Sequence, residues 1–335
     1  MAHIDQEYRR EFYESLKDIP PLVRLPDSMM GSIADLPEAK LLEVYTVWLH
    51  HQDRSNGKRF SVAQLMLDAE KAGRIYPGAT AIMASSGNAV VNLGYNSDAW
   101  GLERVIAVVN KSISEGKKSQ FLIAGCYIAY PREGQTPIER AIELEKAGVG
   151  RFINQYLEVG AILGQKKGPM EHIIREMGRM GKTLSFASIA AGTCATICAA
   201  ELLKEVYPWM QIIGVGCEDK IVPGARTLAD IERDITFGWR KAIGEENDLV
   251  LCDQYSAFAR SAENVEKKGG LFGPTWGLAL EGFFRRFRHL SERRELERFI
   301  NLQGKYVAVI PSMDMPIVYP EYNVILGLEK KVLVQ

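Results

Sequence analysis

The sequence predicts an α/β fold in which two lobes each contain a mostly parallel β-sheet covered by helices. Short apolar runs such as 80–84 and 211–215 alternate with amphipathic segments such as 137–146. This alternation is typical of parallel sheets that carry helices on both faces. A chain of 335 residues, 47% of them hydrophobic, has enough material for about two such lobes, and no internal repeat or low-complexity linker interrupts it.

The elements of the first half follow from the spacing of apolar residues and from the residues that stop helices. Segment 4–17 combines charges with aromatic residues and is expected to form an amphipathic helix that ends before Pro20. Apolar residues recur at helical spacing after Arg59, and Gly73 provides the stop. We expect an extended segment over 21–26, a loop over 26–38, strands over 39–48, 80–84, 105–109 and 122–130, and helices over 59–73, 88–100 and 137–146.

The second half repeats the alternation after a bend expected at 160–168, a segment that contains several glycines. Compact apolar runs mark its strands, and longer amphipathic runs mark its helices. We expect helices over 170–180, 196–207, 257–267 and 278–288, and strands over 183–189, 211–215, 249–251 and 306–310.

The composition disfavours several classes of function. The 41 basic and 42 acidic residues are interspersed and leave a net charge of −1, which favours neither a nucleic acid nor a membrane surface as partner. The five cysteines form no C-x-x-C pair and the histidines show no ligand spacing, so neither disulfides nor a metal site are expected. The N-terminus lacks a signal-peptide pattern, and no apolar run approaches the ~20 residues of a membrane span. These features predict a soluble, cytoplasmic protein.

Two turns, each between a predicted strand and a predicted helix, could bind anions. Small residues there let backbone N–H groups approach a ligand at the positive end of a helix. The first turn suits a carboxylate, although a helix N-cap explains it at least as well; it consists of Ser85, Ser86, Gly87 and Asn88. The second suits a phosphate monoester, with simple packing as the alternative; it consists of Gly192, Thr193, Cys194, Ala195 and Thr196. No G-x-G-x-x-G follows a strand and no Walker pattern is present, which disfavours a nucleotide fold of the usual kind.

Several segments occur in an order that is typical of one enzyme family. They are 21–25 (Pro-Leu-Val-Arg-Leu), Lys58 with 68–73 (Asp-Ala-Glu-Lys-Ala-Gly), 77–78 (Pro-Gly), the two turns above, 273–277 (Gly-Pro-Thr-Trp-Gly) and 311–312 (Pro-Ser). With these segments, over nearly its whole length, the chain resembles the fold-type II enzymes that use pyridoxal 5′-phosphate. The branch it resembles is that of cysteine synthase and cystathionine β-synthase. The first turn is similar to the family's T-S-G-N-T pattern and the second to its G-T-G-G-T phosphate loop.

The resemblance implies a two-lobed fold like that of the tryptophan synthase β-subunit. A smaller, mobile α/β domain over 42–155 would carry the lysine and the carboxylate turn. A larger α/β domain, made of 1–41 and 156–335, would carry the phosphate turn. The resemblance also implies a homodimer.

The resemblance assigns a role to each candidate site residue. Lys58 would form the Schiff base with the cofactor aldehyde and later remove the Cα proton of the substrate, and Asn88 would hydrogen-bond the phenolic oxygen of the cofactor. The pyridine nitrogen would meet a hydroxyl, with Ser312 as first candidate and Thr275 as second, because Met313 occupies the family's serine position. The cofactor phosphate would lie on Gly192, Thr193, Cys194, Ala195 and Thr196. The substrate carboxylate would bind Ser85, Ser86, Gly87 and Gln155.

The chain departs from the family pattern around the expected substrate. Ala89 stands where the carboxylate turn of the family has a second threonine, and Cys194-Ala195 replaces two glycines of the phosphate loop. Trp276 is bulky for a segment expected to line the pocket, and the residues before Lys58 and after Gln155 also differ. These departures favour a non-standard amino acid or nucleophile as substrate.

The resemblance implies a β-replacement on an O-activated, serine-type amino acid through an aminoacrylate intermediate. Two alternatives stay open: a lyase or ammonia-lyase that acts on an amino acid with the same cofactor, and a non-catalytic binding descendant. Arg226 could meet an anionic group of the substrate, although a surface ion pair is the simpler interpretation.

Overall fold

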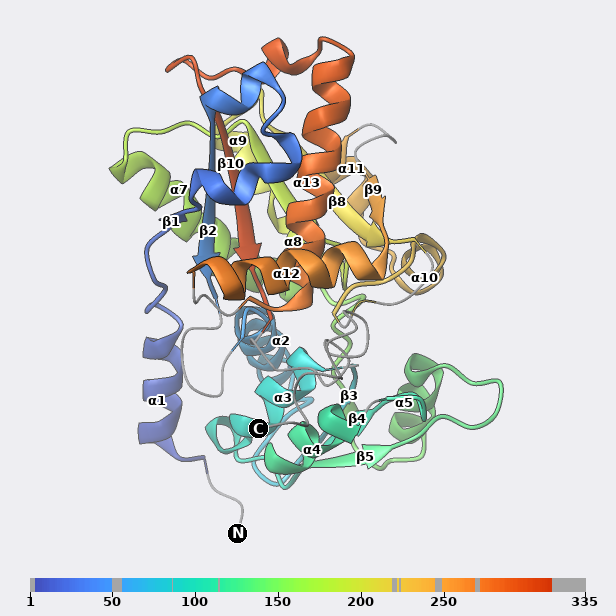
Figure 1. Ribbon diagram of the computed structural model, residues 1–335. Helices are drawn as coiled ribbons and strands as arrows, with labels where there is room; N and C mark the ends of the chain where they lie inside the picture. Colours follow the sequence, from blue (N-terminus) through green and yellow to red (C-terminus); the bar gives the residue numbers. More distant parts are fainter. Residues whose placement is uncertain are drawn as a thin grey trace, which may run out of the picture. The chain divides into compact units, whose positions relative to one another are not determined.

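The computed structural model describes residues 4–49, 56–85, 87–113, 115–218, 222, 224–244, 249–268 and 272–314, with side chains only to 263 within 249–268. The chain forms two compact units. The first unit consists of Met1–Asp18 and Gln52–Gly168, and the second unit consists of Ile19–His51 and Pro169–Gln335. Figure 1 shows the elements of both units along the chain.

The first unit is built on a parallel sheet with the strand order β5-β4-β3-β6. Its strands are β3 (Thr80–Ala84), β4 (Arg104–Val108), β5 (Cys126–Ala129) and β6 (Arg151–Phe152). All four strands run in the same direction, so their carboxyl ends lie along one edge of the sheet. In parallel sheets this edge is the usual place for a ligand.

The helices of the first unit among the described residues are α1 (Gln6–Ser15), α2 (Arg59–Lys71), α3 (Asn88–Tyr95), α4 (Glu115–Ile123), α5 (Pro137–Lys146) and α6 (Gly160–Gln165), with the short 3-10 helix η3 (Ser97–Trp100) after α3 (Figure 1). Helices α3, α4 and α5 pack on the strands of the sheet, and α2 packs on α3 and α6. The N-terminal helix α1 packs on this unit, because the Tyr8 hydroxyl donates to the carbonyl of Tyr95 at 3.0 Å and the ring of Phe12 meets that of Trp100 edge-on. This contact explains why residues 1–18 lie in the first unit.

The bend expected at 160–168 is wrong, because this segment forms α6, which continues as a π-helical turn, η4 (Lys166–Met170). Its glycines recur every four residues and therefore share one face of the helix. A Cβ atom on Gly164 would lie 2.1 Å from the carbonyl oxygen of Phe60, and one on Gly160 would lie 2.5 Å from Oδ2 of Asp68. The glycines thus serve close packing against α2 rather than a change of direction.

We expect Gly164→Ala to destabilise the protein by about 2–4 kcal/mol, because a methyl group would overlap the backbone of α2. Gly178→Ala in the helix after η4 is the matched control, since nothing lies within 4 Å of its Cβ position. That control should leave stability unchanged or raise it by about 0.5 kcal/mol. Denaturant unfolding measures both variants; equal stability of the two would contradict the proposed packing of α6 on α2.

The second unit is built on a six-stranded sheet with the order β1-β2-β10-β7-β8-β9. The strands are β1 (Val23–Arg24), β2 (Leu42–Trp48), β7 (Phe186–Ala190), β8 (Gln211–Cys217), β9 (Leu249–Cys252) and β10 (Tyr306–Ser312). Only β1, at the edge, pairs antiparallel; the other strands are parallel. The prediction of mostly parallel sheets covered by helices is confirmed for both units.

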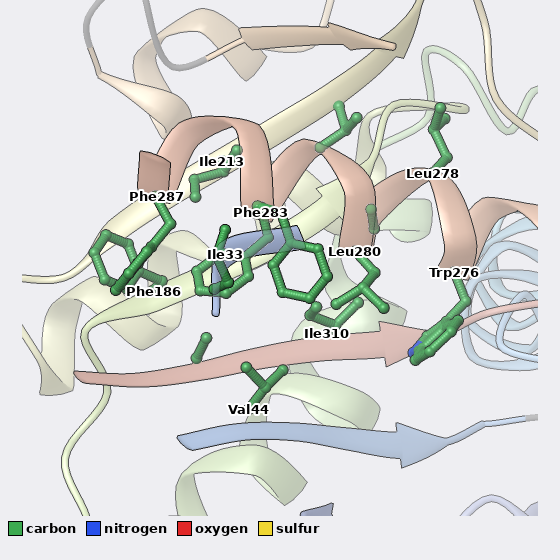
Figure 2. Close-up of a cluster of buried hydrophobic side chains, with 14 of the residues drawn as sticks. Ile33, Val44, Phe186, Ile213, Trp276, Leu278, Leu280, Phe283, Phe287 and Ile310 are labelled. Atoms are coloured by element: carbon green, nitrogen blue, oxygen red, sulfur yellow. The ribbon is translucent and has the colours of Figure 1, made fainter. Parts of the chain in front are cut away.

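The helices of the second unit among the described residues are α7 (Glu171–Arg179), α8 (Ala195–Ala199), α9 (Glu201–Val206), α10 (Leu228–Asp234), α11 (Trp239–Ile243), α12 (Gln254–Lys268) and α13 (Pro274–Glu292). Three 3-10 helices accompany them: η1 (Asp27–Ile33), η2 (Pro37–Leu41) and η6 (Leu296–Phe299). The long helix α13 packs on the central strands (Figure 2). Its Phe283 and Phe287 meet the ring of Phe186 at centroid distances of 5.7 and 6.2 Å.

The observed elements differ from the predicted ones mainly at their ends. Helix α5 and strand β3 have the predicted bounds, and a Thr136 capping box explains the sharp start of α5. The strand predicted over 122–130 begins only at Cys126, because Leu122 and Ile123 end α4. The short helices α10 and α11 were not predicted. The unit boundaries also differ from the domain boundaries expected at 41/42 and 155/156. Helix α1 packs on the first unit, strand β2 pairs with β10 in the sheet of the second unit, and α6 packs on α2 of the first unit.

Candidate functional site

Lys58 lies at the N-terminal end of α2, where a buried asparagine holds it. The backbone N–H of Lys58 donates to Oδ1 of Asn56 at 2.9 Å. The amide group of Asn56 donates in turn to the carbonyl of Asn88 at 3.1 Å. Asn56 is fully buried, so it links the predicted lysine to the predicted cofactor-binding asparagine at the start of α3. The role of Asn56 was missed, although it stands two residues before Lys58.

A second buried amide fixes the turn that carries Lys58. Nε2 of Gln165 on α6 donates to the carbonyl of Gly57 at 2.8 Å and to the hydroxyl of Ser61 at 3.0 Å. The Ser61 hydroxyl donates to the carbonyl of Ala161 at 2.9 Å. The start of α2 is therefore tied to α6 by hydrogen bonds as well as by the glycine face.

The predicted carboxylate turn follows the carboxyl end of β3. Ser85 is buried, and its hydroxyl accepts a hydrogen bond from the N–H of Gly87 at 3.3 Å. Nε2 of Gln155, which follows β6, donates to the carbonyl of Ala84 at 2.9 Å. The structure thus brings Ser85, Gly87 and Gln155 to the same sheet edge. Ser86 lies outside the described residues.

A buried lysine that was not predicted adjoins this turn. Lys117 lies in the first turn of α4 and is 9% exposed. A Cβ atom on Gly87 would lie only 3.2 Å from Nζ of Lys117. The side chain of Lys117 therefore reaches the backbone of the carboxylate turn. The sequence gives no signal for this contact, because 30 residues separate Lys117 from Gly87.

In the second unit, the predicted phosphate turn follows β7 and leads into α8. Gly192 has no room for a side chain, since its Cβ would lie 2.3 Å from the carbonyl oxygen of Gly224. Thr193 and Thr196 are both buried in this turn. The turn therefore presents a tightly closed backbone with two hydroxyl groups.

Cys194, which replaces a glycine of the family pattern, adopts a left-handed backbone with φ of 58°. This conformation costs a side-chain-bearing residue roughly 1–2 kcal/mol. The turn thus keeps a backbone that glycine favours although a cysteine occupies the position. Both Cys194 and Cys198 are buried.

Of the two hydroxyls considered for the pyridine nitrogen, that of Thr275 is the more notable. Thr275 is 4% exposed, and its buried Oγ1 has no hydrogen-bond partner among the described residues. Its backbone N–H, at the start of α13, donates to Oδ2 of Asp314 at 3.1 Å. Ser312 is also buried, and its carbonyl accepts from the N–H of Leu49 at 3.2 Å. A buried hydroxyl with no partner is costly, and a ligand would relieve that cost.

Trp276 lies in the core of the second unit, so its bulk does not fill a pocket as expected. Its indole N–H donates to the hydroxyl of Thr46 at 3.1 Å, and its ring stacks on Phe272 with the centroids 4.1 Å apart. Arg226 forms an ion pair with Asp234. An ion pair is the simpler of the two roles considered for Arg226; the other was contact with an anionic group of the substrate.

The cysteines and histidines of the described residues point to no further chemistry. Burial raises the pKa of the thiols of Cys126 and Cys252 to about 12, which keeps both protonated at neutral pH. Among the residues that the structure describes, no cluster of three or more His, Cys, Asp or Glu side chains could hold a metal ion. No described helix is long and apolar enough to span a membrane.

The geometry of each unit fits the groups of pyridoxal 5′-phosphate that the resemblance assigns to it. In the second unit, Gly192 has no room for a side chain, the hydroxyls of Thr193 and Thr196 belong to buried residues of the same turn, and Oγ1 of Thr275 is buried without a partner among the described residues. In the first unit, Asn56 fixes Lys58 and Asn88 relative to one another.

The comparison with known sequences finds relatives at low identity, and no protein-family model matches. The chain is similar to a probable cysteine synthase of Bacillus subtilis (strain 168), with 24% identity over 228 residues, which are 64% of this chain and 72% of that protein. It is similar to cystathionine beta-synthase of Dictyostelium discoideum, with 24% identity over 283 residues, or 78% of this chain and 56% of that protein. It is also similar to cystathionine beta-synthase of Oryctolagus cuniculus, with 26% identity over 68% of this chain and 44% of that protein. The chain thus spans about half the length of these two cystathionine beta-synthases.

The comparison with solved structures finds close matches over most of the chain. O-ureido-L-serine synthase has a TM-score of 0.75 at 17% identity and covers 97% of this chain and 96% of its own. A hydrogen sulfide-producing enzyme from Fusobacterium nucleatum has a TM-score of 0.75 at 17% identity and covers 92% of this chain and 98% of its own. These matches establish the fold.

Proposed function

We propose that this chain, which has the fold of the fold-type II pyridoxal-phosphate enzymes and is related in sequence to cysteine synthase and cystathionine β-synthase, catalyses β-replacement on an O-activated, serine-type amino acid. The observation that carries the proposal is the link through Asn56, which joins Lys58 to Asn88 at the start of α3. A buried link of this kind is expected where a reactive side chain must be held relative to a second ligand of the same cofactor.

Pyridoxal 5′-phosphate, when bound, supplies the electron sink for bond breaking at the Cα atom of an amino acid. Lys58 would hold the cofactor aldehyde through Nζ and, once the substrate amine replaces it, take the proton from Cα as general base. Asn88 would donate a hydrogen bond to the phenolic oxygen.

The second unit would bind the other end of the cofactor. Residues 192–196 would hold the phosphate through backbone N–H groups and the hydroxyls of Thr193 and Thr196. We favour Thr275 over Ser312 as the hydroxyl partner of the ring nitrogen, because Oγ1 of Thr275 is buried without a partner among the described residues. A neutral hydroxyl stabilises a charged ring less than a carboxylate does, and this favours loss of a β-substituent over long-lived charge at Cα.

The carboxylate of the substrate would bind at the carboxyl end of β3. Ser85, Ser86 and Gly87 would supply hydroxyl and backbone N–H donors there, at the positive end of α3. Gln155 would contribute by holding the carbonyl of Ala84, the last residue before this turn.

Product analysis tests the proposed reaction. The purified protein with added cofactor is incubated with O-acetylserine or O-phosphoserine, with and without sulfide, and the products are identified by mass spectrometry. We expect cysteine to form only when donor, cofactor and sulfide are all present. Formation of pyruvate and ammonia at the same rate with or without sulfide would contradict β-replacement and indicate a lyase.

We further propose that the active form is a homodimer that works in the cytoplasm. Both expectations rest on the resemblance to the enzyme family. Light scattering coupled to gel filtration of the full chain measures the oligomeric state directly.

A further inference from the structure

We propose that Lys117 binds the carboxylate of the amino-acid substrate and so makes a free α-carboxylate a requirement for substrates of this protein. The proposal rests on the proposed function and adds a residue to its carboxylate turn. The ammonium group of Lys117 would form a charge-assisted hydrogen bond with the substrate carboxylate beside Gly87.

The position of Lys117 supports this role. Its side chain leaves the first turn of α4, is nine-tenths buried, and ends against Gly87, with Nζ 3.2 Å and Cε 3.8 Å from the Cβ position of that glycine. Helices α3 and α4 are in contact. Because position 87 has no side chain, the ammonium group can approach the backbone of the turn itself.

The charges around Gly87 favour an anion. Helix α3 begins directly after this residue, and its N-terminus carries a partial positive charge. Its cap residue, Gly87, provides no side-chain acceptor, and its first turn contains no acidic residue. The ammonium group of Lys117 adds a full positive charge to the same place. A carboxylate bound there would interact favourably with both positive groups.

The composition of the turn gives Lys117 a specific purpose. Ala89 is buried and stands where the family pattern has a threonine, so the turn lacks one hydroxyl donor. An ammonium group supplies up to three donors and a charge. Lys117 would therefore replace the missing hydroxyl with a stronger, charge-assisted interaction. It lies on α4, outside the carboxylate turn itself.

Substrate titration tests this role against a purely structural one. The cofactor-loaded protein is titrated with O-acetylserine and with its methyl ester, which lacks the carboxylate, while visible absorbance is recorded. We expect Lys117→Met to weaken the apparent affinity for O-acetylserine by about 10- to 100-fold. The ester should bind weakly to the unchanged protein, and the substitution should not affect it further. Lys117→Arg should retain much of the affinity.

Lys118→Met is the matched control, since Lys118 lies on the same helix but pairs with Glu115 at the surface. It should bind O-acetylserine normally. If Lys117→Met fails to fold, Lys117→Gln takes its place, with Lys117→Arg as its charged counterpart. Two outcomes would overturn the assignment of Lys117 but leave the proposed reaction standing. One is an unchanged affinity for O-acetylserine in the neutral variants, and the other is an equal loss of affinity for O-acetylserine and for its methyl ester. Absence of any response to O-acetylserine in the unchanged, cofactor-loaded protein would overturn the proposed donor, and the role of Lys117 with it.

Discussion

A Lys58→Ala variant is expected to lose the covalent attachment of the cofactor and about 10³-fold or more of its activity, because one side chain would serve as attachment point and as base. Lys58 lies at the start of α2 with its backbone held by Asn56. Removing its side chain leaves that backbone hydrogen bond intact, so the fold should persist. Borohydride reduction followed by denaturation measures the attachment: the unchanged protein should retain the cofactor and the variant should release it.

Lys71→Ala is the control for this experiment. Lys71 ends the same helix and is exposed, so its loss should change neither attachment nor rate. Retention of the reduced cofactor by Lys58→Ala would show that another lysine makes the bond. Lys117 would then be the first to examine, since its Nζ lies 3.2 Å from the Cβ position of Gly87 in the carboxylate turn.

Gly192→Ala is expected to weaken cofactor binding by at least 10-fold, because a methyl group at this position would lie 2.3 Å from the carbonyl oxygen of Gly224. No side chain can yield there, since the neighbouring atom belongs to the backbone. The phosphate turn must therefore move, and its N–H groups with it. We also expect a loss of about 1–3 kcal/mol in the free energy of unfolding.

Fluorescence titration with pyridoxal 5′-phosphate measures the affinity of the Gly192 variant. Gly178→Ala, in α7 of the same unit, provides the control because nothing lies within 4 Å of its Cβ position. The control should bind the cofactor as tightly as the unchanged protein. Normal affinity in Gly192→Ala would contradict the assignment of the phosphate to this turn.

The elements that could be predicted from the sequence are those with strong local signals. Helix α5 begins at a threonine and proline that cap it and ends before a glycine at 148 with positive φ, so both of its ends are determined locally. Strand β3 is a compact apolar run between a glycine turn and two serines. The family motifs could also be recognised from the sequence, because each consists of consecutive residues, and their order along the chain indicated the fold class.

The parts that could not be predicted depend on contacts between distant segments. In the sequence alone the glycines of α6 suggest a bend, whereas in the structure they allow α6 to pack closely against α2. Trp276 belongs to a motif expected to line a pocket, yet its partner Thr46 lies on strand β2, 230 residues away in the sequence. Lys117 meets Gly87 only because α4 packs on α3. In each case the tertiary neighbour decides the role of the residue, and a single sequence does not reveal it.

The departures from the family pattern also become clearer in the structure. Cys194 adopts a left-handed backbone, which glycine adopts more readily than other residues. Ala89 is compensated in our proposal by Lys117. In our proposal the ring nitrogen meets the hydroxyl of Thr275, whose Oγ1 is buried without a partner among the described residues.

The visible absorbance spectrum of the purified protein, recorded with added pyridoxal 5′-phosphate before and after O-acetylserine, tests whether Lys58 binds this cofactor and whether the bound cofactor reacts with an O-activated serine. We predict an absorbance band from the cofactor bound to Lys58, and a shift of that band when O-acetylserine is added. Such a shift would support the cofactor, the lysine linkage and the class of substrate together. A protein that shows no band even with excess cofactor would contradict the account and favour a non-catalytic binding role.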